Sequence, residues 1–261
     1  MTKVVLLEKV YGQNRPEDFT PALLTLCSGL EVEVKVVGTA GRGWLVVEVF
    51  GEDEHVALEL LKEEMGLAPV RPDGVKRFST IRGKTLSVRP NGLLVDVGIF
   101  EPFNLDAFLP LRTLRAQLAD GLDMDMDKLA SLLGLCEGLP LEVKLLEEPS
   151  GEAGRPIEAE LSEGQVRAFE DWVFTGLDRL VITGASHHAV KKAVGGSGFY
   201  KQVVAIERLG FLENCVVLKL GASTKRIFRA LRRRLSGANI MVFRPRAIIE
   251  ALPGRFRSSG F

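Results

Sequence analysis

The first seventy residues alternate between strand-like and helix-like patterns of apolar positions. Glu31–Val37 alternates charged residues with valine, and Trp44–Phe50 is rich in valine, which favours two β-strands. The glycines of Gly38–Gly43 suit a hairpin between these strands. The full pattern predicts strands at 3–10, 31–37 and 44–50 and helices at 16–28 and 52–65. This β-α-β-β-α order predicts an N-terminal α/β sandwich over residues 1–70.

Short strands separated by turns dominate residues 71–162. The pattern predicts one helix, at 126–135, before the fourth of five strands, at 79–89, 93–98, 107–111, 139–146 and 157–161. Five short strands with a helix in that position are typical of a Greek-key barrel of the OB type. We therefore expect the central domain to be a five-stranded OB-fold.

The last third of the chain has the element order of a ferredoxin-like unit. After a leading helix at 163–175, the pattern predicts strands at 179–183, 202–208, 214–220 and 239–243 and helices at 186–194 and 224–235. In such a β-α-β-β-α-β unit, two helices cover one face of an antiparallel sheet. Ser186 can cap the first of these helices and Gly195 can end it. The sequence thus predicts an α+β protein with three domains, at 1–70, 71–162 and 163–261.

The helix predicted at 224–235 is strongly basic, although the chain as a whole is neutral. The chain has 34 Lys and Arg and 34 Asp and Glu, yet residues 219–261 hold eleven basic residues and a single acid, Glu250. At about 100° per residue, an apolar stripe forms from Ile227, Phe228, Leu231 and Leu235. Five cations then lie in an arc beside this stripe: Lys225, Arg226, Arg229, Arg232 and Arg233. We expect a packed helix that shows these cations to solvent.

Clustered basic side chains of this kind point to an anionic partner. Guanidinium groups match phosphate oxygens with paired hydrogen bonds, and their contact with nucleic acid releases counterions. The predicted nucleic-acid-binding residues are Lys191, Lys192, Lys225, Arg226, Arg229, Arg232, Arg233, Arg234, Arg244 and Arg246. The alternative is a solvated helix face, in which the last arginines suit the negative end of the helix dipole.

Part of the central segment resembles a known RNA-binding module. Val88–Gly98 places a glycine before an apolar strand that ends in Asp-Val-Gly, and Asp106–Pro110 follows it. These residues are similar to the OB module named after ribosomal protein S1. The resemblance implies that RNA bases stack on aromatic rings near the glycine. This chain has Asn91, Leu93 and Leu94 at that place, so the candidate stacking rings are Phe100, Phe103 and Phe108. The alternative is that these rings close the barrel.

A second resemblance concerns the C-terminal third. Val204–Glu213, together with Leu218–Gly221, resembles the C-terminal part of an archaeal protein family of unknown function. The resemblance implies an archaeal cytoplasmic protein and brings no catalytic residues with it. The predicted domain order is also similar to that of RNA-binding subunits of the archaeal exosome and of the alpha subunit of an archaeal initiation factor.

Motifs for catalysis, metals and cofactors are incomplete. Leu180–Ser186 resembles the first turn of a dinucleotide-binding fold, but the later glycines are missing. Cys27, Cys136 and Cys215 are far apart in apolar surroundings, which predicts buried thiols, and the three histidines lack metal-ligand spacing. We therefore expect no metal, no cofactor and no enzyme activity.

The chain also lacks the features of a membrane or secreted protein. No apolar run approaches the roughly 20 residues that span a bilayer. The N-terminus has no signal-peptide architecture. We predict a cytoplasmic protein without a membrane partner.

Taken together, these patterns predict a non-catalytic RNA-binding protein of archaeal translation or RNA processing. Its partner would be a ribosomal or otherwise structured RNA, or the ribosome itself, held by phosphate contacts to the basic helix. Two other functions stay open. The acidic and basic parts of the chain could serve a protein-interaction adaptor that binds no nucleic acid. The β-α-β-β-α-β unit is also similar to ligand-binding ACT domains, which implies a small-molecule sensor.

Overall fold

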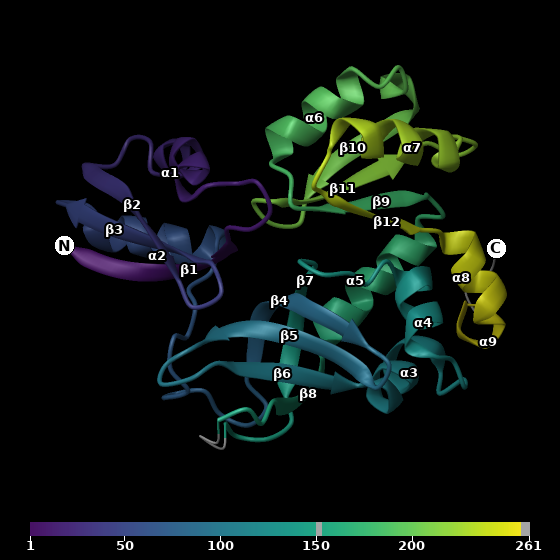
Figure 1. Ribbon diagram of the computed structural model, residues 1–261, viewed down its shortest axis with the longest axis horizontal. Helices are drawn as coiled ribbons and strands as arrows, with labels where there is room; N and C mark the ends of the chain where they lie inside the picture. The colour runs from purple at the N-terminus through teal and green to yellow at the C-terminus, as the bar shows by residue number, and fades with distance from the viewer. Residues whose placement is uncertain (150–152, 257–261) are drawn as a thin grey trace.

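The computed structural model describes residues 1–149 and 153–256, in which the strands form two open sheets and a closed barrel (Figure 1). We call the three parts the N-terminal unit, the barrel unit and the C-terminal unit. The N-terminal and C-terminal units both lie against the barrel unit. The α+β class and all three predicted architectures are confirmed.

The N-terminal unit is a three-stranded antiparallel sheet covered by helices. It contains β1 (Thr2–Lys9), η1 (Pro16–Phe19), α1 (Thr20–Leu26), β2 (Val32–Ala40), β3 (Trp44–Gly51) and α2 (Glu54–Glu64), with β3 between β1 and β2. Leu45, Val47 and Val49 on β3 pack in the core with Phe19 and Leu61. The first residues of β3 are buried on both faces, because the other face of the sheet lies on the barrel.

The barrel unit has the strand order of an OB-fold. Its strands are β4 (Thr80–Arg89), β5 (Gly92–Ile99), β6 (Leu105–Pro110), β7 (Pro140–Leu145) and β8 (Ile157–Leu161), closed in the order β4-β5-β6-β8-β7. Every pair is antiparallel except β6 with β8. Between β6 and β7 lie two helices, α3 (Leu111–Ala119) and α4 (Met126–Leu133). The sequence prediction had only α4, because it assigned Leu111 to the preceding strand.

The C-terminal unit follows α5 (Glu163–Phe174) and is ferredoxin-like. Its elements are β9 (Arg179–Thr183), α6 (His187–Gly195), η2 (Tyr200–Gln202), β10 (Val203–Arg208), β11 (Glu213–Leu218), α7 (Thr224–Arg234) and β12 (Asn239–Phe243). The sheet is antiparallel, in the order β10-β11-β9-β12. Leu180 and Ile182 on β9 pack with Val190 of α6 and Leu231 of α7. The two helices therefore cover one face of the sheet.

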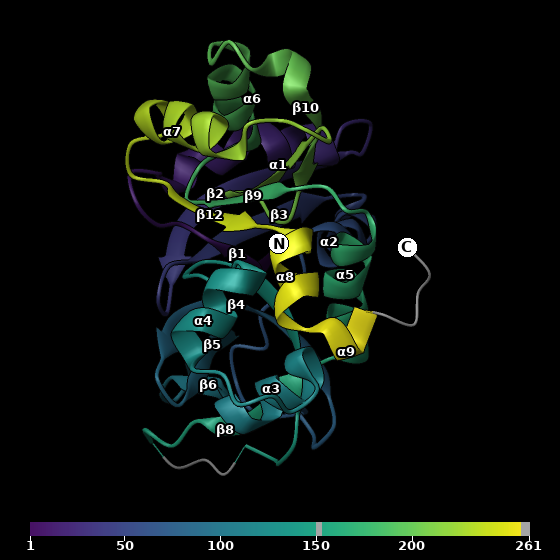
Figure 2. The same cartoon turned by 90° about the vertical axis from the view of Figure 1, so that its right-hand side faces the viewer.

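The other face of this sheet joins the core of the barrel unit. Val181 on β9 and Phe243 on β12 alternate with the helix-facing residues and belong to the same apolar cluster as the barrel interior. Two further helices, α8 (Pro245–Ala251) and α9 (Pro253–Phe256), continue this cluster beside α5 (Figure 2). Arg255, one of the basic residues in 219–261, binds Asp120 and Glu170 at 3.0 and 2.7 Å.

The predicted domain boundaries fall between α2 and β4 and between β8 and α5. That each unit is a separate domain stays a prediction. Within the described residues, no helix combines the length and the apolar composition needed to cross a membrane.

We predict that Phe243→Ala strongly destabilises the protein. Phe243 is fully buried, and Trp172 packs edge-on against it with a centroid distance of 5.3 Å. The cavity should lower the free energy of unfolding by about 3–5 kcal/mol. The control is Phe50→Ala, where the ring is exposed and the loss should stay below about 1 kcal/mol. Equal urea midpoints for the two variants would contradict the packing described here.

Candidate nucleic-acid interface and the junction of the three units

Helix α7 presents its cations to solvent because its apolar side is fixed on the sheet. Ile227 and Leu231 are buried against the sheet, and the Thr224 hydroxyl donates a hydrogen bond to Asp178, just before β9. The cations predicted on this helix are exposed: Lys225, Arg226, Arg229, Arg232, Arg233 and Arg234. The amphipathic helix predicted from the sequence is confirmed.

Five of the ten predicted binding residues line one groove between α7 and β12. The groove has a volume of about 940 Å³, and its cations are Lys225, Arg229, Arg232, Arg233 and Arg244. Phe228 and Val242 supply its apolar surface. In the part of the chain that the structure describes, none of the five cations is in an ion pair. Their charges are therefore free to meet an anion.

The other five predicted residues lie outside this groove. The Arg226 guanidinium lies 5.6 Å from the centre of the Phe199 ring, and Arg234 donates to the carbonyl of Gly196 at the end of α6. Lys191 and Lys192 are exposed on α6, and Arg246 is exposed on α8. Arg226 and Arg234 thus already have partners within the C-terminal unit.

The three candidate stacking rings are half-buried and pack against protein. Phe103 packs on the barrel core. Phe100 lies so close to Gly41 that a Cβ there would come within 2.8 Å of the ring, and Phe108 similarly covers Gly92 at 2.9 Å. This geometry favours the interpretation that the rings complete the fold.

The N-terminal unit covers a row of charged residues on the outer face of the barrel. Lys84, Asp96 and Asp106 lie directly opposite one another on β4, β5 and β6. Each meets an opposite charge: Lys84 binds Glu8 at 2.6 Å, Asp96 binds Lys9 at 2.5 Å and Asp106 binds Arg42 at 2.6 Å. The Trp44 indole also donates to Asp96, at 3.1 Å. The strand face with which OB-folds bind oligonucleotides is therefore occupied here by the chain itself.

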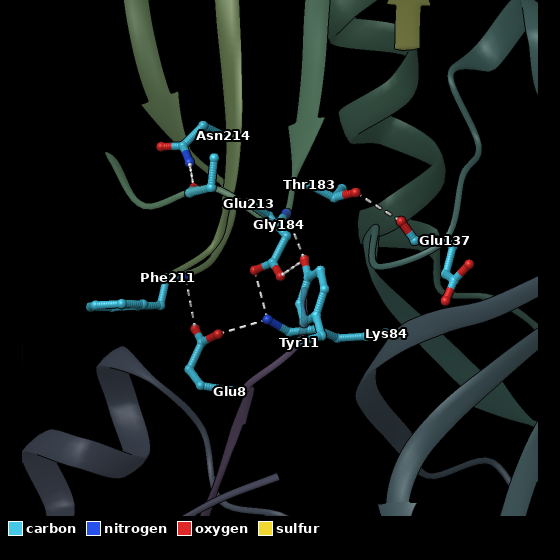
Figure 3. A network of polar contacts seen from close by, with 10 residues as sticks. Glu8, Tyr11, Lys84, Glu137, Thr183, Gly184, Phe211, Glu213 and Asn214 are labelled. Atoms are coloured by element: carbon cyan, nitrogen blue, oxygen red, sulfur yellow. Dashed lines mark hydrogen bonds and ion pairs between the residues drawn. The ribbon is translucent and has the colours of Figure 1, made fainter. Parts of the chain in front are cut away.

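Lys84 also joins the barrel to the C-terminal unit (Figure 3). Its ammonium group lies 2.6 Å from a carboxylate oxygen of Glu213, the first residue of β11. The other Glu213 oxygen accepts a hydrogen bond from the Tyr11 hydroxyl, which itself accepts one from the Gly184 N–H at 3.0 Å. Glu8 accepts a further bond from the Phe211 N–H at 3.1 Å. Residues from all three units thus meet in one buried cluster.

Burial determines the protonation of this cluster. Desolvation raises the pKa of Glu8 more than the attraction of Lys84 lowers it, and the charge of Glu213 raises it further. The two carboxylates outweigh the desolvation of Lys84 and raise its pKa, so it stays a cation. Burial beside Glu213 also raises the pKa of Tyr11, which remains a hydrogen-bond donor. When Glu8 takes up a proton it is neutral, and the positive charge of Lys84 then balances the negative charge of Glu213.

The cysteine and histidine side chains can be placed in the structure. No three His, Cys, Asp or Glu side chains among the described residues could hold a metal ion. The cysteines are free and buried, as predicted. The His187 ring contacts Asn214 at 2.8 Å, and partial burial lowers the pKa of this histidine.

The comparisons with known proteins identify sequence similarity at both ends of the chain. Residues 3–70 match the DUF2110 N-terminal domain, and residues 177–243 match the DUF2110 C-terminal domain. The two segments hold 68 and 67 of the 261 residues, which is more than half of the chain. No curated protein matches the chain at a significant level.

Among solved structures, the chain is similar to the intact alpha subunit of aIF2 from Pyrococcus abyssi. The identity is 12%, the alignment covers 65% of this chain and 97% of that one, and the TM-score is 0.25. A structure from Thermus thermophilus is 13% identical over 96% of this chain and 42% of that one, with a TM-score of 0.19. Scores this low assign neither a fold nor a function.

We predict that Lys84→Met destabilises the protein far more than Lys62→Met. Removal of the buried ammonium group leaves Glu8 and Glu213 facing each other without a countercharge. The loss of such a partner costs about 3–5 kcal/mol. Lys62 pairs with Glu59 on an exposed helix surface, where an ion pair contributes less than about 1 kcal/mol. Chemical denaturation of both variants provides the test, and similar losses would contradict the bridging role of Lys84.

The raised pKa of Glu8 predicts a pH dependence that Glu8→Gln removes. The native protein binds a proton at Glu8 more tightly than the unfolded chain, whose carboxyl has the ordinary pKa of 4.5. This contribution to stability is complete below that pH and is lost as the pH rises through the higher native pKa. We therefore expect the difference in unfolding free energy between wild type and Glu8→Gln to decrease as the pH rises from about 4.5 to about 8. Chemical denaturation across this pH range measures it. A constant or growing difference would contradict the raised pKa.

Proposed function

The chain belongs to the DUF2110 family, and we propose that it is a non-catalytic RNA-binding protein that holds phosphates in the groove between α7 and β12. The observation that carries this proposal is the convergence on one groove of five cations that form no ion pair within the described residues. Four come from a single helix, and Arg244 joins them from the end of β12. The arrangement depends on the tertiary fold as well as on a basic run in the sequence.

The chemistry of the groove suits a sugar-phosphate backbone. Arginine presents a planar fork that matches two phosphate oxygens, and four of the five cations are arginines. Such contacts position an RNA without reading its bases. A ribosomal or otherwise structured RNA, which offers phosphates at fixed spacing, therefore fits better than a short sequence motif. The sequence resemblances described above favour archaeal translation or RNA processing as its setting.

The barrel contributes to this proposal as a support for the groove. Its β5–β6 face is covered by the N-terminal unit through Asp96 and Asp106. RNA could reach that face only after Trp44 and Lys9, both buried, had moved away. The α7–β12 groove is open without any rearrangement, which makes it the better binding surface.

We predict that Arg229→Ala, Arg232→Ala and Arg233→Ala together weaken RNA binding at every sequence tested. Three lost phosphate contacts should reduce the slope of log affinity against log salt by roughly 2–3. The measurement is equilibrium binding to structured RNA, single-stranded RNA and duplex DNA across a salt series. An unchanged affinity and an unchanged slope for structured RNA would refute the proposed site.

The matched control removes three exposed lysines from elsewhere, at Lys3, Lys35 and Lys76. This variant changes the net charge equally but leaves the groove intact, so its salt slope should stay close to that of wild type. Point variants are preferable to a truncation before Lys219, because Leu231 and Phe243 beyond it are fully buried. An equal loss of RNA affinity in both triple variants would show that net charge alone drives the binding.

A further inference from the structure

A cavity lies where the three units meet. Lys84 and Glu8, which belong to the buried cluster shown in Figure 3, line this cavity. Its volume is about 490 Å³, within the range of about 300–1,000 Å³ typical of small-molecule sites. Glu8 and Lys84 lie in its wall. Their mutual ion pair and the Glu213 contact hold this wall in place. The cavity is therefore part of the junction between the three units.

The walls of the cavity have two chemical characters. The apolar part includes Ala22, Leu26 and Met65 of the N-terminal unit and Phe211 of the C-terminal unit. The polar part contains Arg82 from β4 and Arg208 from β10. An apolar wall combined with a few converging polar groups is typical of sites for small organic molecules.

The two arginines are available to an incoming anion. Arg208 forms no ion pair within residues 1–149 and 153–256. Arg82 lies 3.9 Å from Glu142, and the side chains are 64% and 35% exposed, so water weakens this pair. Both arginines also line an adjoining groove beside Trp172. They therefore lie between this groove and the cavity.

The charges of the cavity favour an anionic ligand. Its cations are Arg82, Lys84 and Arg208, and its acids are Glu8 and Glu64. Glu213 also binds Lys84 from behind the wall, so the net charge is zero when all three acids are ionised and becomes positive when Glu8 takes up a proton. Because Lys84 is already held by Glu8 and Glu213, the two arginines are the groups left to bind an oxyanion.

We propose that this cavity binds a small organic oxyanion, a phosphate or carboxylate carried on an apolar body. Arg82 and Arg208 hold the oxyanion, and the body lies against Leu26, Met65 and Phe211. The ligand would contact all three units and so stabilise their arrangement. This site is separate from the α7–β12 groove, and the inference does not depend on RNA binding.

The test is thermal unfolding of the full chain with adenosine monophosphate, octanoate or inorganic phosphate. The first two each carry an oxyanion, a phosphate in adenosine monophosphate and a carboxylate in octanoate. Their bodies are a nucleoside with an aromatic base and an aliphatic chain, and inorganic phosphate has no body. We expect at least one of the two organic anions to raise the melting temperature by about 3 °C when its concentration is about ten times its Kd. No shift with either organic anion, or an equal shift with inorganic phosphate, would overturn the proposal.

Two variants locate the binding. Arg82→Ala with Arg208→Ala removes two exposed side chains, so the fold should persist while the ligand-induced shift disappears. The triple variant Arg229→Ala, Arg232→Ala and Arg233→Ala removes the other cluster of cations and should keep the shift. The opposite result, a shift lost only in the triple variant, would place the anion in the α7–β12 groove and overturn the cavity site.

Discussion

Lys84 is the residue on which the arrangement of the three units depends. A buried ammonium group is tolerated only when it is paired and hydrogen-bonded. Its two carboxylate partners lie 76 and 129 residues away in the sequence and belong to different units. An arrangement that keeps Lys84 buried but misplaces one of the units leaves this charge without a partner. We infer that the cluster acts mainly by disfavouring incorrect assemblies.

This arrangement has a direct consequence for the binding surfaces. The N-terminal unit places Lys9, Arg42 and Trp44 on the outer face of the barrel, which removes the usual oligonucleotide surface of an OB-fold from solvent. The C-terminal sheet packs its other face on the barrel unit through Val181 and Phe243. Helix α7 is thereby directed outward, away from the barrel (Figure 2). The basic groove is exposed because the apolar side of α7 packs on the C-terminal sheet, and the other face of that sheet packs on the barrel unit.

Local patterns in the sequence predicted most of the fold and all five cations of the candidate groove, which are half of the ten binding residues predicted. Strand alternation and helical spacing depend on neighbouring residues, so the three architectures could be predicted. Helix α3 was missed because Pro110 and Leu111 continue an apolar strand pattern. Helices α8 and α9 were missed because Pro245 and Pro253 suggest a loop, although proline suits the first turn of a helix.

The junction could not be predicted in the same way. Glu8, Lys84 and Glu213 each stand in or beside an apolar strand, and nothing local distinguishes them from solvent-facing charges. Their roles depend on contacts between distant parts of the chain. The same holds for Arg226 and Arg234, whose positions on the helix were predicted correctly but whose partners, Phe199 and Gly196, come from the region around α6. Helical geometry gives the direction of a side chain but not its neighbour.

Ultraviolet crosslinking of a bound structured RNA to the intact protein, followed by mass spectrometry of the crosslinked peptides, tests the central claim most directly. The account predicts that the crosslinks concentrate in residues 224–246, which contain α7, β12 and Arg244. Crosslinks concentrated in residues 91–110, on β5 and β6, would contradict it, because RNA would then reach the face that the N-terminal unit covers.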